Sequence, residues 1–366
     1  MAKSKKADVR YLVTDLDRTM IFSKKFYKDD LELVPVEYKN GEVISYMTRD
    51  ALSVVERKLE YIIPATTRSL HEFQRVTPFQ KAAWAIVGNG SIILHNGEVV
   101  EEWNDKIQSI KQRLKTDYQQ LINWMEGLSH LQEGVEPKMV EGFIFAKVKP
   151  EEKVTIVSVL EDKLKDFPDW QFVIQKQKLY LLPKEVSKEA AVSYVKNKIP
   201  GKFHFAGDGK LDVGMLELSN NLYDSCAFIP MNSDALMLAN VRHKLLVDSG
   251  PEGAERTLRT VFKMEDNTDV VLSTYGSREK TDPLHITPRT ENATLRALCC
   301  FDSRLTSLHF SRKLYPEIGW DKFVAYLEAS GMKTFRTKSR GFGRQAEVEL
   351  SKVIAHKKGL LQEALA

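Results

Sequence analysis

The chain has 366 residues, of which 43% are hydrophobic and 28% are charged, as in ordinary globular proteins. No apolar run approaches the roughly 18 residues that a membrane-spanning helix needs. The first ten residues carry lysines but no apolar segment follows them, so we expect neither a signal peptide nor a membrane anchor and predict a cytoplasmic protein. Three cysteines without metal-ligand spacing exclude a disulfide framework. The length allows two or three domains.

The net charge of +4 is distributed unevenly along the chain. Residues 271–366 contain 16 Lys and Arg against 10 Asp and Glu, whereas residues 1–270 contain 38 against 40. The basic character therefore belongs to the C-terminal quarter.

Three apolar runs have the character of strands buried on both faces of a parallel sheet. They are "VRYLVT" at 9–14, "YIIPATTRS" at 61–69 and "KFHFAGDG" at 202–209. Each run ends in small or polar residues and precedes a helical pattern. Because ligands of open α/β sheets lie at the carboxyl ends of the strands, we expect these three polar ends to converge on one site.

Residues 88–183 show a different pattern from the parallel-strand runs, with a hairpin, helical stretches and further strands. An Asn-Gly pair at 96–97 predicts a hairpin turn there, as another pair at 40–41 does between the first two runs. We predict an α/β fold with a Rossmann-like parallel-sheet core formed by residues 8–87 and 184–264. An α+β cap, residues 88–183, is inserted into this core, and residues 265–366 form an additional basic α+β domain.

Asp15 and Asp17 follow the first predicted strand directly. Residues two apart on an extended strand face the same side, and two carboxylates so close repel unless a cation or a proton lies between them. Asp208 and Asp212 add two more carboxylates at the end of the third strand. These hard oxygen ligands suit Mg²⁺, which we predict as the cofactor.

The other polar segments supply groups that bind phosphate. Thr66 offers a hydroxyl near a helix start, where backbone amides also point outward. Lys188 begins a helix behind the predicted cap Ser187, and its ammonium is a point charge able to bridge carboxylate and phosphate.

Four segments, "DLDRT", "ATTRS", "SKEAA" and "GDGKLDVGML", resemble in order and character the four motifs of the haloacid dehalogenase superfamily. Their spacing is similar to that of the branch with a large α/β cap, which includes sucrose-phosphate and mannosyl-phosphoglycerate phosphatases. The resemblance covers about residues 8–264. It implies a phosphoric monoester hydrolase that works through an aspartyl phosphate.

The resemblance also implies roles for individual residues. Asp15 would be the nucleophile, Asp17 the general acid and base, and Lys188 the charge that offsets them. Thr66 would bind the phosphoryl oxygens, with Thr67 and Arg68 beside it. Magnesium would be held by Asp15, Asp17 through its backbone carbonyl, Asp208 and Asp212. Arg68 fits a phosphate or substrate contact and ordinary surface charge equally well.

The sequence departs from the family pattern at three places. Thr67 stands where glycine usually follows the threonine of the second motif. Leu211 stands where asparagine usually precedes the second aspartate of the fourth motif, which removes one hydrogen bond to the metal site. The hairpin near residues 34–48 is also longer than usual. None of these changes deletes a charged catalytic group.

A cap of nearly 100 residues that closes over the site favours a small phosphate ester, because closure excludes water and polymers alike. A sugar phosphate is the default substrate. Asn89 occupies a position from which such caps often meet the sugar, although an asparagine of a turn fits it equally well.

The C-terminal segment 331–345, "GMKTFRTKSRGFGRQ", is basic without any acid and contains two phenylalanines. Basic residues with interleaved aromatic residues are typical of segments that bind phosphate backbones and stack on bases. This pattern supports an alternative function, a phosphatase of nucleotides or nucleic-acid ends whose C-terminal domain binds nucleic acid or a nucleotide-like ligand. A solvated basic loop, or an edge strand protected by lysines, explains the same pattern. The basic residues are Lys333, Arg336, Lys338, Arg340 and Arg344.

Overall fold

A computed structural model describes residues 9–262, apart from gaps at 28–30, 133–135, 223–224, 232, 242–243 and 248, together with five short strands beyond residue 262. No helix in these described ranges is both long and apolar enough to cross a bilayer.

The centre of the fold is a five-stranded sheet in the order β14-β13-β12-β1-β4, with every neighbouring pair parallel. All three predicted runs lie in it, as β1, β4 and β12. The predicted Rossmann-like core is therefore confirmed. The strands are β1 (Arg10–Thr14), β4 (Ile62–Pro64), β12 (Lys202–Ala206), β13 (Ala227–Pro230) and β14 (Lys244–Val247).

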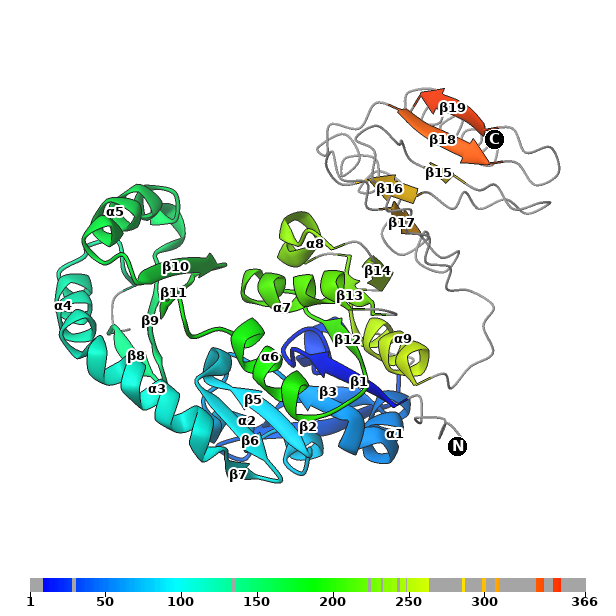
Figure 1. Cartoon of the computed structure of the whole chain (residues 1–366), viewed down its shortest axis with the longest axis horizontal. Helices are drawn as coiled ribbons and strands as arrows, with labels where there is room; N and C mark the ends of the chain where they lie inside the picture. Colours follow the sequence, from blue (N-terminus) through cyan, green and yellow to red (C-terminus); the bar gives the residue numbers. More distant parts are fainter. Residues whose placement is uncertain are drawn as a thin grey trace, which may run out of the picture.

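Helices cover both faces of this sheet (Figure 1). Side chains alternate along each strand, so Leu12 packs in the core cluster of α1 and α9, whereas Val13 packs in that of α6 and α7. Both residues are fully buried, which explains why β1 reads as a continuous apolar run. The helices are α1 (Arg49–Lys58), α6 (Lys188–Lys198), α7 (Val213–Glu217) and α9 (Pro251–Val261). Two short helices, α2 (Leu70–Phe73) and α8 (Asp234–Leu238), follow strands of the core.

Two antiparallel units accompany the core sheet. The hairpin of β2 (Leu33–Lys39) and β3 (Glu42–Thr48) turns at Asn40 and Gly41, as the sequence predicted. Strands β5 (Trp84–Val87), β6 (Ile92–His95) and β7 (Glu98–Val99) form a second unit, which joins the core through a parallel bridge between Ala65 and Ile86. Residues 92–99, which we assigned to the cap, thus pair with β5 and not with the cap sheet.

The cap contains an antiparallel sheet in the order β10-β11-β9-β8. Apolar side chains of α3, α4 and α5 cover one face, and these helices lie at the left of Figure 1. The opposite face carries the small cluster of Phe143, Tyr180 and Leu182. The elements are α3 (Glu101–Arg113), α4 (Lys115–Glu126), β8 (Lys138–Val140), β9 (Phe143–Lys147), α5 (Thr155–Lys163), β10 (Trp170–Gln175) and β11 (Lys178–Pro183).

Beyond residue 262 the structure describes backbone pairing alone. Strand β18 pairs with β15 in parallel and with β19 in antiparallel fashion, and β16 pairs with β17. These strands are β15 (His285–Ile286), β16 (Leu298–Cys300), β17 (Ser307–His309), β18 (Thr334–Lys338) and β19 (Gln345–Glu349).

Candidate active site

Three polar segments meet at the carboxyl edge of the central sheet. Asp15 follows β1, and its backbone N–H donates to the carbonyl of Ala206 at the end of β12 (2.9 Å). Asp208 and Asp212 lie in the loop after β12, and Lys188 is the first residue of α6. All four residues are at least 94% buried. The convergence predicted from the sequence is therefore present in the structure.

Lys188 joins two of these carboxylates. Its Nζ donates to Oδ1 of Asp15 and to Oδ1 of Asp212, both at 2.6 Å. Ser187 caps α6, as predicted, by accepting a hydrogen bond from the Ala190 N–H (3.2 Å). Burial alone would lower the pKa of Lys188, but Asp15 and Asp212 outweigh it and hold this pKa above its ordinary value. The side chain is therefore a fixed positive charge between the two acids.

The loop after β12 brings its carboxylates close to the backbone. Asp212 Oδ2 accepts from the Gly209 N–H (2.8 Å). A Cβ atom on Gly207 would lie 2.6 Å from the Cβ of Asp212, so only glycine allows this approach. The loop holds Asp212 with both of its oxygens engaged.

Asp15, Asp208 and Asp212 each offer an oxygen to a shared position, with the three oxygens within 4.8 Å of one another. Burial, followed by the nearby charge of Asp212, raises the pKa of Asp208 to about 7. Burial also raises the pKa of Asp15, against the opposing effect of Lys188. Asp208 Oδ2 is buried and makes no hydrogen bond, although Arg18 Nη1 is 3.1 Å away. This crowded oxygen set fits a hard divalent cation such as Mg²⁺.

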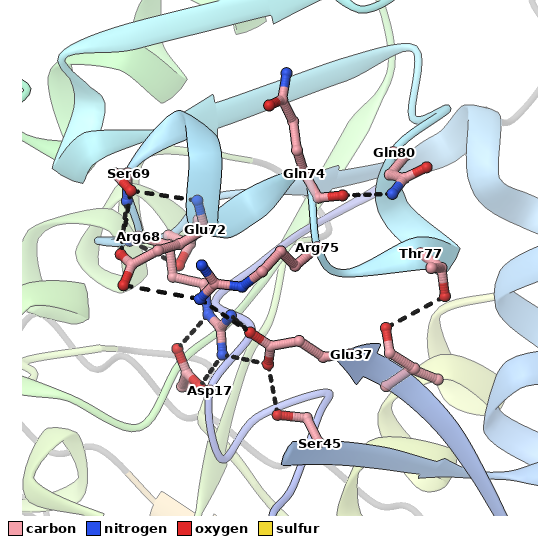
Figure 2. A network of polar contacts seen from close by, with 12 residues as sticks. Asp17, Glu37, Ser45, Arg68, Ser69, Glu72, Gln74, Arg75, Thr77 and Gln80 are labelled. Atoms are coloured by element: carbon pink, nitrogen blue, oxygen red, sulfur yellow. Dashed lines mark hydrogen bonds and ion pairs between the residues drawn. The ribbon is translucent and has the colours of Figure 1, made fainter. Parts of the chain in front are cut away.

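Asp17 points to a different partner. Arg68 binds it in a bidentate manner, with Nε 2.8 Å from Oδ2 and Nη2 2.7 Å from Oδ1 (Figure 2). Desolvation by the surrounding walls of the cavity would raise the pKa of Asp17, but the hydrogen bonds and charge of Arg68 lower it below its ordinary value. The resting form of Asp17 is thus the carboxylate, which is a base.

Arg68 is itself held by Glu37, a residue of β2. Nη1 lies 2.5 Å from Glu37 Oε1 and Nη2 lies 3.0 Å from Oε2. Glu37 has no exposed surface, and it also accepts from Ser45 Oγ (2.7 Å) and approaches Arg75 Nη2 (3.5 Å). Figure 2 shows this buried network beneath α2. The structure places Arg68 in an ion-pair network with Asp17 and Glu37, an arrangement that neither of the two interpretations of Arg68 had described.

The predicted phosphate-binding segment contributes two residues in different ways. Thr66 is fully buried, and its hydroxyl accepts from the Arg68 N–H (3.2 Å). Thr67 lines the cavity in front of the carboxylates. Asn89, considered for substrate contact, is buried with a φ of 56°, its N–H donates to the Thr66 carbonyl (3.0 Å), and it does not line the described cavity. Its position is that of a turn residue.

A cavity of about 640 Å³ opens between the core and the cap. The tip of the β10–β11 hairpin contacts the loop after β12. The contact is close, since a Cβ atom added to Gly209 would lie 2.7 Å from Gln175 Nε2. The core side contributes four carboxylates, whereas the cap side contributes lysines, glutamines and Tyr180. The lining residues are Asp15, Asp17, Arg18, Thr67, Lys147, Pro150, Lys153, Gln175, Lys176, Gln177, Lys178, Tyr180, Lys188, Asp208, Leu211 and Asp212.

Two departures from the family pattern lie at the contact with the cap. Leu211 packs against the cluster of Phe143, Tyr180 and Leu182. Thr67 lies close to the side chain of Tyr180, whose pKa is raised mainly by burial. Both substituted residues therefore contact the pocket-facing side of the cap sheet.

The predicted C-terminal patch contributes nothing to this site that the structure describes. Lys333, Arg340 and Arg344 lie outside the described residues, and Arg336 and Lys338 belong to β18, for which only backbone pairing is described.

Sequence reasoning missed Arg18, Glu37 and the lysines of the cap. Arg18 has a signal in its position directly after the aspartates. Glu37 has a weaker one, as an acid between Val36 and Tyr38 in an apolar hairpin strand. The cap lysines had no such signal in the sequence, because their position near the site depends on how the cap packs against the core.

No family model and no curated protein matches the chain. Solved structures do. The chain is similar to a sucrose-phosphatase from Synechocystis sp. PCC6803, solved with sucrose and phosphate, with 20% identity over 70% of this chain and 98% of that one and a TM-score of 0.49. A trehalose-6-phosphate phosphatase related protein has 17% identity over 69% and 97% with a TM-score of 0.44. A HAD/COF-like hydrolase from Plasmodium vivax has 15% identity over 71% and 98% with a TM-score of 0.43.

The four sequence motifs lie together at one sheet edge beneath a large α+β cap. The motif order and the capped fold resemble those of the haloacid dehalogenase superfamily. In this arrangement the side chains of Asp15, Asp17 and Lys188 line one cavity.

Proposed function

We propose that the chain is a magnesium-dependent phosphatase of small phosphate monoesters, with sugar phosphates as the first class to test. The observation that carries this proposal is Lys188, fixed 2.6 Å from both Asp15 and Asp212 at the base of a cavity that the cap closes. Spontaneous hydrolysis of phosphate monoesters is among the slowest reactions known, so this concentration of charge suits the task.

The residues divide the reaction into two steps. A carboxylate oxygen of Asp15 attacks phosphorus, the bond to the leaving oxygen breaks, and Asp17 gives that oxygen a proton. Asp17 then takes a proton from water, whose oxygen attacks the phosphoaspartate and releases phosphate. Because Arg68 lowers the pKa of Asp17, the resting enzyme is prepared for the second step, and Asp17 must gain a proton before the first.

Lys188 neutralises part of the charge that Asp15 and the phosphoryl group bring together. Asp15 and Asp208 would hold Mg²⁺, with Asp212 beside them and the backbone carbonyl of Asp17 as a further oxygen. When bound, the ion would screen the carboxylates from the phosphoryl oxygens and draw off negative charge as the ester bond breaks.

Phosphate release from a panel of sugar phosphates, with and without a chelator, tests the proposal. Asp15→Asn is the control, because it removes the nucleophile with little change of shape. We expect release that needs both magnesium and Asp15. Equal release by the wild type and Asp15→Asn would contradict the proposal.

The alternative substrate class, nucleotides or nucleic-acid ends, rests on the C-terminal basic segment. Its side chains lie outside the described residues, and no observation on the described part of the chain favours nucleic acid. We therefore do not propose this activity.

A further inference from the structure

The cap side of the cavity carries four lysines, Lys147, Lys153, Lys176 and Lys178, and no acid. Among the residues that the structure describes, none of the four forms an ion pair with a carboxylate. The fold therefore brings four positive charges to one wall of the cavity, opposite the carboxylates of the core, and pairs none of the four directly with an acid.

Two of these lysines lie side by side on neighbouring strands of the cap sheet. Lys147 of β9 and Lys178 of β11 are direct partners in the antiparallel register. Side chains of such a pair lie about 5 Å apart, and like charges in this position destabilise a sheet. Both share the face of Phe145 and Tyr180, which is the face that the helices leave uncovered. The register thus places a repulsive pair where a ligand enters.

The third lysine stands in a strained turn. Lys176 follows Gln175 at the tip of the β10–β11 hairpin and has a φ of 57°. Two-residue hairpin turns require a positive φ at this position and strongly favour asparagine or glycine there. The hairpins at 40–41 and 96–97 both use Asn-Gly. The hairpin at 141–142 carries Glu141 with a φ of 52°, so Lys176 is one of two such turn residues in the described part of the cap that are neither asparagine nor glycine. Of these two, Lys176 lines the cavity, and strain of this kind persists mainly at functional positions.

We propose that this cap wall is a subsite for a second anionic group of the substrate, a carboxylate or a second phosphate on the leaving alcohol. An anion there would relieve the Lys147–Lys178 repulsion and use the charge of Lys176, so two features that are unfavourable in the free protein become favourable contacts. The substrate class is then a phosphate ester with a separate negative charge, not a neutral sugar phosphate. This inference rests on the proposed function for the orientation of the ester.

Binding measurements on the Asp15→Asn protein in magnesium test the subsite without turnover. Calorimetry compares fructose 1,6-bisphosphate with fructose 6-phosphate, and 3-phosphoglycerate with glycerol 3-phosphate. We expect the doubly anionic ligand of at least one pair to bind about tenfold tighter. The first pair reports a second phosphate and the second a carboxylate. Equal affinities within both pairs would overturn the subsite.

Two substitutions remove charge while relieving an unfavourable feature. Lys147→Gln removes the like-charge pair, and Lys176→Asn places a residue that tolerates positive φ in the turn. We expect both to reduce the preference for the doubly anionic ligand at least severalfold, roughly the value of one charge-assisted contact, without lowering the melting temperature. Lys178 is left unchanged because it also lowers the pKa of Asp17. Retention of the full preference by the double variant would refute the assignment.

Lys165→Gln is the matched control, since Lys165 is a cap lysine paired with Asp162 outside the cavity. The preference of this variant for the doubly anionic ligand should equal that of the Asp15→Asn protein. Phosphate release by the wild type, measured separately, distinguishes the two proposals. Release from singly charged esters without any anion preference would remove the subsite and keep the phosphatase. Tighter binding of the doubly anionic ligands without Asp15-dependent phosphate release would keep the subsite and contradict the phosphatase.

Discussion

Arg68 connects Asp17 to Glu37, with two hydrogen bonds to each carboxylate. Glu37 has no exposed surface, whereas the Asp17 side chain is 52% exposed. The guanidinium of Arg68 thus fixes the orientation of the Asp17 carboxylate at the cavity by linking it to Glu37 on the hairpin strand β2. Because β2 and β3 lie between the first two motifs, the long hairpin there serves to orient Asp17.

Glu37→Gln should destabilise the protein strongly. The substitution leaves Arg68 and Arg75 partly uncompensated in a buried position, and breaking a buried ion pair costs about 3–5 kcal/mol. Urea unfolding followed by circular dichroism measures the change. Glu32→Gln, which breaks the exposed pair with Arg49, is the control and should cost less than about 1 kcal/mol. Similar losses in the two variants would contradict this role for Glu37.

Arg68→Met should change the pH dependence of the reaction. Without the guanidinium, the pKa of Asp17 is no longer lowered, so Asp17 stays protonated to higher pH. We expect the alkaline limb of kcat/KM for an alkyl phosphate to move to higher pH. For p-nitrophenyl phosphate, whose leaving group needs little protonation, the limb should move less.

Arg75→Met is the matched control for Arg68, because Arg75 contacts Glu37 and, in the described part of the chain, makes no ion pair with Asp17. It should lower stability while leaving the alkaline limb unchanged. An unshifted limb in Arg68→Met would show that Arg68 does not set the protonation of Asp17.

Magnesium should stabilise the wild type, and Asp208→Asn should abolish this effect. A ligand at 100 times its Kd adds about 2.7 kcal/mol, which thermal unfolding detects. Because the pKa of Asp208 is raised to about 7, the fold disfavours its ionised form. The Asn variant should therefore be the more stable protein in chelator at pH 8. Asp166→Asn, at an exposed position, should respond to magnesium like the wild type.

Glu255→Gln should flatten the pH dependence of stability. Burial raises the pKa of Glu255, which accepts a hydrogen bond from Thr48 at the start of α1. A raised acid pKa gives stability that is present below the unfolded value, about 4.3, and is lost as pH rises through the folded value. Glutamine keeps the acceptor without this loss. Denaturation at several pH values checks it, with the exposed Glu56→Gln as control, and an unchanged slope in Glu255→Gln would contradict it.

The sequence was sufficient to place the groups that follow directly from strands and caps. A strand buried on both faces has a distinctive apolar run, so the positions of Asp15 and Asp208 at strand ends could be read from residue order. Lys188 was predicted from its cap Ser187. These features depend on neighbours a few residues away, and local sequence specifies them.

The remaining features depend on contacts between distant segments. Arg68 fitted two roles until the structure showed Glu37, 31 residues away, at its other side. The opposition of Lys147 and Lys178 depends on strand register, which is set across the whole cap sheet. Hairpin 92–99 was assigned to the cap because its sequence shows the turn but not which strand it pairs with.

Thr67 and Leu211 of the core lie against Tyr180 and its neighbours in the cap. The contact surfaces of the core and the cap are therefore complementary to each other. A cap taken from a relative with glycine and asparagine at those core positions would meet a methyl group and an isobutyl group for which it has no complementary surface. Exchange of caps between such proteins would therefore need the second and fourth motif loops to move together with β11.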